Sequence, residues 1–247
     1  MKVAVITGGS RGLGASIARQ SARRGFGVIL TYNTDATAAE AVVKDIETQG
    51  GRAVALQLDV AKSATFAAFR DEARTQLRAR WERDGFDVLV NNAGYGLFNP
   101  IAAVTEEQFD GLFQVHLKGP FFLTQALLPL IAQGGHVINI ASATTRVATA
   151  GVAPYAAFKG GLEVLTRYMA KELGPRGIRA NAISPGAIRT ELAGGIPPEF
   201  EALLAGQTAL GRIGEPDDVG EAVAALMGDE NRFINAQSIE IAGGYLI

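Results

Sequence analysis

The sequence predicts an α/β fold, in which a mainly parallel sheet of seven strands is flanked by helices. Short apolar runs, often β-branched, alternate with longer segments of helical spacing, and no linker or low-complexity tract interrupts the alternation. With 247 residues, 48% of them hydrophobic, the chain is long enough for one large core and short for two. We therefore expect residues 1–247 to form one domain.

Each expected element has its own signal in the sequence. Short apolar runs predict strands at residues 2–7, 28–32, 53–58, 88–91, 136–141, 179–184 and 238–241. Helical spacing predicts helices that begin near Gly12, Thr37, Ser63, Thr105, Tyr155 and Asp217. Strands and helices of these lengths form βαβ units. Residues 186–198, rich in Pro and Gly, are expected to be a loop over a binding site, since such loops at strand ends bind ligands.

Charge and hydropathy exclude several function classes. The 23 basic and 25 acidic residues leave no overall field to attract nucleic acid or an anionic membrane. The most basic stretch, residues 78–83, is interrupted by Glu82 and is interpreted as a solvated helix face. The longest apolar region, residues 120–132, is broken by Pro129 and is too short to span a bilayer. Without a signal-peptide pattern, the expectation is a soluble cytoplasmic protein.

Metal and thiol chemistry are not predicted. The chain has no cysteine, which excludes disulfides, thiolate zinc sites and a cysteine nucleophile. His116 and His136 are the only histidines, too few for a histidine metal cluster.

A glycine-rich turn, Thr-Gly-Gly-Ser-Arg-Gly-Leu-Gly at residues 7–14, follows the first predicted strand. Gly8, Gly12 and Gly14 permit a tight strand-to-helix turn and let backbone amides approach a pyrophosphate at the amino end of the helix. Glycines alone are weak signals in a chain that has 30 of them. The position between a strand pattern and a helix pattern favours a nucleotide site over a plain loop.

Tyr155 and Lys159 stand one helical turn apart, thirteen residues after Ser142. A phenol with a pKa of about 10 exchanges protons poorly near neutrality, but a nearby ammonium would lower that pKa by roughly 1 to 3 units. The i, i+4 spacing places such an ammonium on the same helix face. With the glycine-rich turn, the pair predicts a nicotinamide cofactor and hydride transfer. Each residue also has a plainer interpretation: an exposed helix pair, and a strand-ending hydroxyl for Ser142.

Together these motifs resemble the short-chain dehydrogenases/reductases over essentially the whole chain. Residues 7–14 resemble the family's TGxxxGxG turn, residues 91–94 its NNAG motif and residues 155–159 its YxxxK motif, while Ser142 falls where its catalytic serine lies. Ser-Pro-Gly at residues 184–186, with the later Thr190, resembles its segment after the sixth strand. The pattern is similar to 3-oxoacyl-acyl-carrier-protein reductases, although reductases of sugars, steroids and small ketones share it.

The resemblance implies a single Rossmann-like, doubly wound domain that interconverts a small-molecule carbonyl and an alcohol. Tyr155 would be the general acid in reduction and the base in oxidation, Lys159 would lower its pKa and hold the nicotinamide ribose, and Ser142 would bind the substrate oxygen. Asp59 would accept a hydrogen bond from the adenine, or it simply caps the next helix or the turn before it. The implied cofactor-binding residues are Gly8, Ser10, Arg11, Gly12, Leu13, Gly14, Asn33, Asp59, Val60, Asn91, Ala93, Gly94, Tyr155, Lys159, Pro185, Gly186, Ile188 and Thr190.

The family geometry also implies a mostly apolar substrate pocket and a homo-oligomer. The implied pocket residues are Tyr95, Leu97, Phe98, Thr144, Arg146, Val152 and the loop at residues 186–198, with Arg146 either an anion contact or a surface residue. The helices that contain His116 and Tyr155 would form part of a dimer or tetramer contact.

His116 departs from the family pattern, which usually has an asparagine there that helps hold a water linked to the catalytic lysine. A histidine either preserves a hydrogen-bonded proton path or is a packed substitute that weakens one. A protein that binds the nucleotide as a regulator or scaffold, without turnover, is therefore the alternative function.

Charge near the second strand predicts NADP(H) rather than NAD(H). An acid at the end of that strand would bind the ribose 2′-hydroxyl and repel a 2′-phosphate, whereas a nearby arginine would favour the phosphate. The strand ends at Asn33 with no acid before Asp35, and Arg11 lies in the glycine-rich turn.

Overall fold

The computed structural model describes residues 1–247, apart from the side chain of Ala193. One seven-stranded sheet has the order β3-β2-β1-β4-β5-β6-β7, and every neighbouring pair is parallel, which confirms the predicted fold class. The strands are β1 (Val3–Ile6), β2 (Gly27–Tyr32), β3 (Ala53–Gln57), β4 (Phe86–Asn91), β5 (Ile131–Ile140), β6 (Arg179–Pro185) and β7 (Ser238–Ile241).

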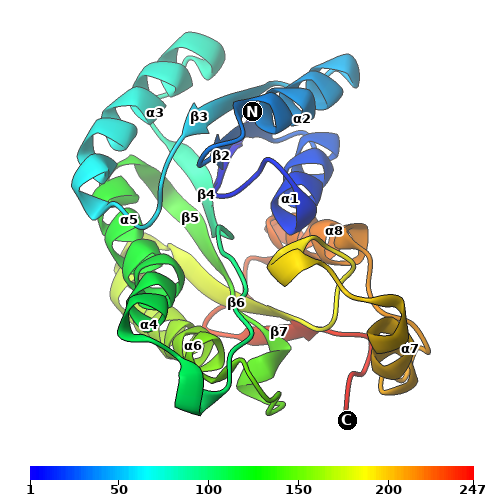
Figure 1. The fold of residues 1–247 in the computed structure, drawn as a ribbon. Helices are drawn as coiled ribbons and strands as arrows, with labels where there is room; N and C mark the ends of the chain where they lie inside the picture. Colours follow the sequence, from blue (N-terminus) through cyan, green and yellow to red (C-terminus); the bar gives the residue numbers. More distant parts are fainter.

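Helices cover both faces of the sheet (Figure 1). One face carries α1 (Gly12–Arg23), α2 (Ala36–Thr48) and α8 (Pro216–Leu226), and the other carries α3 (Phe66–Trp81), α5 (Gly119–Leu127) and α6 (Ala153–Leu173). Two buried apolar cores hold these layers together, one around α1, α2 and α8 and the other around α3, α5 and α6. Strands β1 to β6 therefore bury side chains on both faces, as expected for the interior of a parallel sheet, whereas none of the residues of the edge strand β7 is fully buried.

Three further helical segments complete the chain. Helix α4 (Glu106–Phe113) packs outside α6 and begins with a capping box, in which Thr105 and Gln108 exchange hydrogen bonds between side chain and backbone. A π-helical turn, Gln114–Lys118, joins α4 to α5. Helix α7 (Pro198–Gly206) follows the loop after β6.

The largest differences from the predicted elements are in β5, α5 and α7. Strand β5 begins at Ile131 rather than 136, because Gly134 and Gly135 interrupt the apolar pattern and the register with β4 shifts there. Helix α5 lies inside the long apolar region and was not predicted, since it is apolar on several sides. Helix α7 begins at Pro198, where the predicted loop ends.

The sheet topology determines where a ligand can bind. All seven strands end at the same edge, and the strand order reverses between β1 and β4, where open α/β sheets bind their ligands. The glycine-rich turn follows β1, the NNAG motif follows β4, Ser142 follows β5 and Pro185 ends β6. The four motifs thus meet at one edge of the sheet.

Two kinds of feature are absent from the described part of the chain. It contains no helix that is long and apolar enough to cross a membrane. It also contains no group of three or more histidine, aspartate or glutamate side chains that could hold a metal ion.

His136 is buried between the central strands β5 and β6. Its Nε2 lies 2.9 Å from the Asn181 amide nitrogen, which donates to it, so the ring is neutral. Burial, with the nearby Arg179 charge, holds the pKa of His136 well below its ordinary 6.5. The free energy of unfolding therefore contains a contribution that is present above pH 6.5 and lost as the pH falls.

We expect the free energy of unfolding to decrease between pH 6.5 and pH 5, because an unfolded histidine takes up a proton that the buried ring refuses. Each such histidine adds a slope of about 1.4 kcal/mol per pH unit, and His116 is buried in the same way. Urea unfolding at several pH values measures this slope. His136→Gln should remove roughly half of it, and an unchanged slope in that variant would show that His136 is not responsible.

Candidate active site

Thr7 joins the ends of the two central strands β1 and β4. Its hydroxyl lies 3.3 Å from the carbonyl of Val90 and accepts hydrogen bonds from the backbone N–H groups of Asn92 (2.9 Å) and Ala93 (3.0 Å). The Asn92 amide donates back to the carbonyls of Thr7 (2.8 Å) and Gly8 (3.2 Å). The glycine-rich turn and the NNAG motif are therefore one hydrogen-bonded unit.

The glycine-rich turn has the geometry that a pyrophosphate requires. Gly8 has a φ of +65°, and a Cβ there would lie 2.9 Å from the Cα of Ala93, so only glycine fits without distortion. Among the described residues, no side chain caps the first turn of α1, whose N-cap is Arg11. Its backbone N–H groups are thus available to an anion, and they lie at the positive end of the helix.

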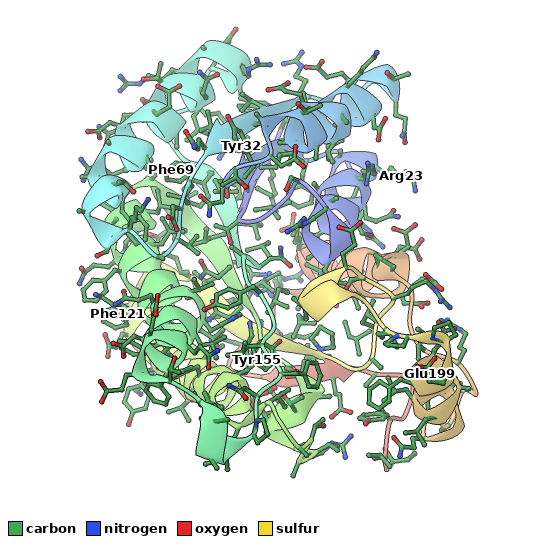
Figure 2. All side chains as sticks on the ribbon, in the orientation of Figure 1. Arg23, Tyr32, Phe69, Phe121, Tyr155 and Glu199 are labelled. Atoms are coloured by element: carbon green, nitrogen blue, oxygen red, sulfur yellow. The ribbon has the colours of Figure 1, made fainter. Side chains whose placement is uncertain are left out.

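Ser142, Tyr155 and Lys159 lie together beyond β5. Ser142 accepts hydrogen bonds from the backbone N–H (3.2 Å) and the hydroxyl (2.9 Å) of Thr144, which leaves its own hydrogen free to donate. Lys159 is buried, and its Nζ donates to the carbonyl of Ile140 (2.6 Å) and lies 5.6 Å from the Tyr155 ring centroid. In the view of Figure 2, Tyr155 lies between Phe121 of α5 and Glu199 of α7.

The expected lowering of the Tyr155 pKa by Lys159 is wrong for the protein alone. Withdrawal from water raises the pKa of the Tyr155 phenol, and the neighbouring Ser142 hydroxyl offsets only part of that rise. Burial also lowers the pKa of Lys159 to about 7, so near neutrality its side chain is only partly an ammonium. Desolvation is therefore the largest cause of both pKa shifts.

His116 lies in the π-helical turn and contacts Tyr155 directly. The two ring centroids are 5.0 Å apart in an edge-to-face arrangement. Its Nε2 lies 2.8 Å from the carbonyl of Tyr95, which assigns the ring hydrogen to Nε2, and Nδ1 has no hydrogen-bond partner within the described residues. Burial and the nearby Lys159 charge lower the pKa of His116 to about 3, so the ring is neutral at physiological pH.

The loop after β6 reaches back to the glycine-rich turn. Thr190 lies within 3.7 Å of where a Cβ on Gly12 would be, and Arg11 pairs with Glu191 at 3.7 Å. Pro185, Gly186 and Ile188 lead into this loop, and Ile188 is held by a short parallel bridge to Gly214. The predicted phosphate and nicotinamide residues are thus neighbours.

Several predicted ligand residues have side chains that already serve the fold. Asn91 is buried and donates to Thr124 (3.1 Å) and Asn139 (2.8 Å), so its amide supports the strands. Asp59 accepts from the backbone of Ala61 (3.0 Å), which agrees with its interpretation as a turn residue. Its predicted contact with adenine stays a prediction, as do the contacts of Ser10, Leu13, Asn33, Val60 and Gly94.

Arg146 is not free to bind an anionic substrate. Its guanidinium forms a two-pronged ion pair with Glu240 (2.6 and 2.8 Å) and donates to the carbonyls of Tyr245 (2.7 Å) and Leu246 (2.9 Å). These partners fix the segment after Ser142 to β7 and the chain's last residues. The alternative interpretation of Arg146, as a surface residue, therefore agrees with its exposed and already paired side chain.

Sequence reasoning missed the roles of four polar residues that shape the site. Thr7 and Asn92 lie within recognised motifs, so their positions were known while their mutual bonds were not. Thr144 was expected in the substrate pocket, but its hydrogen bonds to Ser142 were not predicted. Glu163 has one signal, its place one helical turn after Lys159 on α6.

Comparison with known proteins decides the family. Residues 8–246 match the family described as Enoyl-(Acyl carrier protein) reductase. A 3-oxoacyl-[acyl-carrier-protein] reductase FabG of Staphylococcus aureus is 36% identical over 245 residues, which cover 98% of this chain and 97% of that protein. The chain belongs to the short-chain dehydrogenase/reductase family. Members of this family are NAD(P)-dependent oxidoreductases, so the expectation of an enzyme is confirmed.

Further members of the short-chain dehydrogenase/reductase family are similar over their full lengths. An uncharacterized oxidoreductase of Methylorubrum extorquens is 40% identical, with 98% of this chain and 97% of that protein covered. The angucycline C-6 ketoreductase LanV, solved with bound NADP, superposes with a TM-score of 0.95 at 33% identity and covers 99% of this chain and 95% of its own. A short chain dehydrogenase from Burkholderia cenocepacia in complex with NADP gives a TM-score of 0.92 at 34% identity, with coverage of 100% and 98%.

The packing of His116 against Gly94 generates a stability prediction. A Cβ on residue 94 would lie 2.7 Å from Cε1 of His116, whose buried ring is held by Tyr95. Gly94→Ala should therefore lower the free energy of unfolding by about 1–3 kcal/mol. Adding His116→Ala should relieve that clash, giving a coupling of about 0.5–3 kcal/mol in a double-mutant cycle measured by urea unfolding.

Gly160→Ala is the matched control, because a Cβ on this α6 residue meets nothing within 4 Å. It should leave stability unchanged or raise it by up to about 1 kcal/mol. Strictly additive effects of the 94 and 116 substitutions would refute the described packing.

Proposed function

We propose that this short-chain dehydrogenase/reductase interconverts a carbonyl and an alcohol with NADP(H), and that Tyr155 is its general acid and base. The observation that carries the proposal is the cluster of Ser142, Tyr155 and Lys159 at the sheet edge where the glycine-rich turn also lies. NADPH, when bound, supplies the hydride for reduction. The chain supplies the proton and the hydrogen bonds.

Each residue of the cluster has a task that fits its surroundings. In reduction, Ser142 donates its free hydrogen to the carbonyl oxygen, where negative charge develops, and Tyr155 delivers the proton. Because the pKa of Tyr155 is raised, its phenol is protonated at neutral pH and ready to donate. Lys159 has a pKa of about 7, so it can take part in reprotonating the phenol near neutrality.

The substrate is proposed to be a small carbonyl compound with an apolar body. Tyr95 and Phe98 follow the NNAG motif with exposed side chains, and Arg146 is already neutralised by Glu240. Names of similar proteins span acyl-carrier-protein reductases and an angucycline ketoreductase. A substrate panel should therefore contain both a 3-oxoacyl thioester and polycyclic ketones.

Tyr155→Phe should lower kcat by about 10²–10⁴-fold, because it removes the transferred proton and leaves the ring in place. NADPH oxidation against the carbonyl panel measures turnover, and fluorescence of bound NADPH measures cofactor affinity, which should stay nearly unchanged. Turnover by the variant at the wild-type rate would exclude Tyr155 as the acid. Wild-type protein that binds NADPH but reduces no carbonyl would instead favour the scaffold alternative.

The preference for NADP(H) over NAD(H) is supported by charge at the end of β2. Asn33 and Asp35 are exposed there, but the Asp35 carboxylate accepts a hydrogen bond from the backbone of Ala38 (2.9 Å) as the N-cap of α2. Arg11 is exposed in the glycine-rich turn and only loosely paired with Glu191. A guanidinium is therefore available to a 2′-phosphate.

Arg11→Ala should weaken NADPH binding by about tenfold or more and leave NADH binding nearly unchanged, since only NADPH carries the 2′-phosphate. Arg24→Ala, at the opposite end of α1, is the control for removing one positive charge. Equal losses for both cofactors would indicate that Arg11 shapes the turn instead. Tighter binding of NADH than NADPH by the wild-type protein would overturn the preference itself.

A further inference from the structure

Glu163 gathers three hydroxyl groups, one from the turn after β5, one from β6 and one from the first residue of β7. Its Oε1 accepts hydrogen bonds from Thr145 after β5 (3.0 Å), Ser184 in β6 (2.7 Å) and Ser238 in β7 (2.9 Å). A carboxylate only accepts hydrogen bonds, and each hydroxyl carries one hydrogen to donate. The arrangement thus matches one acceptor to three donors.

Two of these donors lie next to the segments that carry the proposed reaction. The Thr145 hydroxyl also lies 2.9 Å from the main-chain oxygen of Ser142, so Glu163 and Ser142 share its hydrogen. Ser184 is followed at once by Pro185 and Gly186, the segment proposed to line the nicotinamide. Glu163 is therefore connected both to the turn that carries Ser142 and to the segment proposed to line the nicotinamide.

Glu163 is also fixed to the proton donor through its own helix. Tyr155, Lys159 and Glu163 follow each other at intervals of four residues on α6, one turn apart, so they form one stripe along the helix. Helix α6 is thereby tied to the turn that carries Ser142 and to the end of β6. This connection sets how the proton donor, the substrate oxygen and the cofactor segment lie relative to one another.

We infer that Glu163 is a positioning residue for the hydride transfer, an inference that rests on the proposed function. It does not touch the reacting atoms. It holds the Ser142 turn and the Pro185–Gly186 segment in register with Tyr155. Because misplacement by 1 Å costs about 10²-fold in rate, the effect of losing Glu163 belongs in kcat rather than in binding.

Glu163→Ala should lower kcat by about 10²-fold and change KM and NADPH affinity by less than about threefold. Glu163→Gln keeps one acceptor oxygen and should recover most of that loss. Thr145→Val should cause part of the loss in kcat. The Glu163→Ala/Thr145→Val double variant should be no slower than Glu163→Ala, because the two residues act through the same hydrogen bond. With NADPH deuterated at the transferred hydride, the isotope effect on kcat should rise in Glu163→Ala.

Glu172→Ala is the matched control, an exposed glutamate on the same helix. Thermal unfolding confirms that each variant is folded, and Glu163→Gln and Thr145→Val keep the test valid if Glu163→Ala does not fold. An active wild type with Glu163→Ala as fast as Glu172→Ala would overturn the inference, as would an equal loss in kcat and in NADPH affinity. An inactive wild type would refute the proposed function first, which separates the two failures.

Discussion

The hydroxyl of Thr7 is the point on which the cofactor end of the site depends. Strands β1 and β4 are neighbours in the sheet but are not consecutive in the chain, so no crossover connection joins them directly where the strand order reverses. Thr7 joins their ends with bonds to the backbone at Val90, Asn92 and Ala93. The two glycine motifs can then approach so closely that Gly8 leaves no room for a side chain.

Desolvation governs the chemical end of the site. The same burial raises the pKa of Tyr155 and lowers that of Lys159 to about 7, so it favours the neutral form of both groups. A neutral phenol is a donor and a neutral amine is an acceptor, which suits a site that begins carbonyl reduction by giving up a proton. On the proposed function, the protein alone would thus hold the pair in the protonation state that reduction requires.

The local sequence pattern was sufficient to predict most strands and helices and the motif residues of the site. The run at Val3–Ile6 and the glycines after it predicted both β1 and the turn, because each depends on neighbours in sequence. Helix α5 was missed because its exposed face carries Phe121 and Phe122, which removes the polar face that marks a helix. The ion pair of Arg146 and the hydrogen bonds of Glu163 could not be predicted, since the partners Glu240 and Ser238 lie far along the chain.

His116 stands where the family usually has an asparagine, and it keeps a hydrogen bond within the site but does not donate a proton to a relay near neutrality. With its hydrogen on Nε2 given to the carbonyl of Tyr95, the ring ties the π-helical turn to the segment after the NNAG motif. A pKa of about 3 leaves no proton to donate near neutrality, so only the lone pair of Nδ1 is left to join a hydrogen-bonded path, as an acceptor. The edge-to-face contact with Tyr155 meanwhile restricts the phenol ring. On the proposed function, His116 would therefore contribute chiefly by orienting Tyr155.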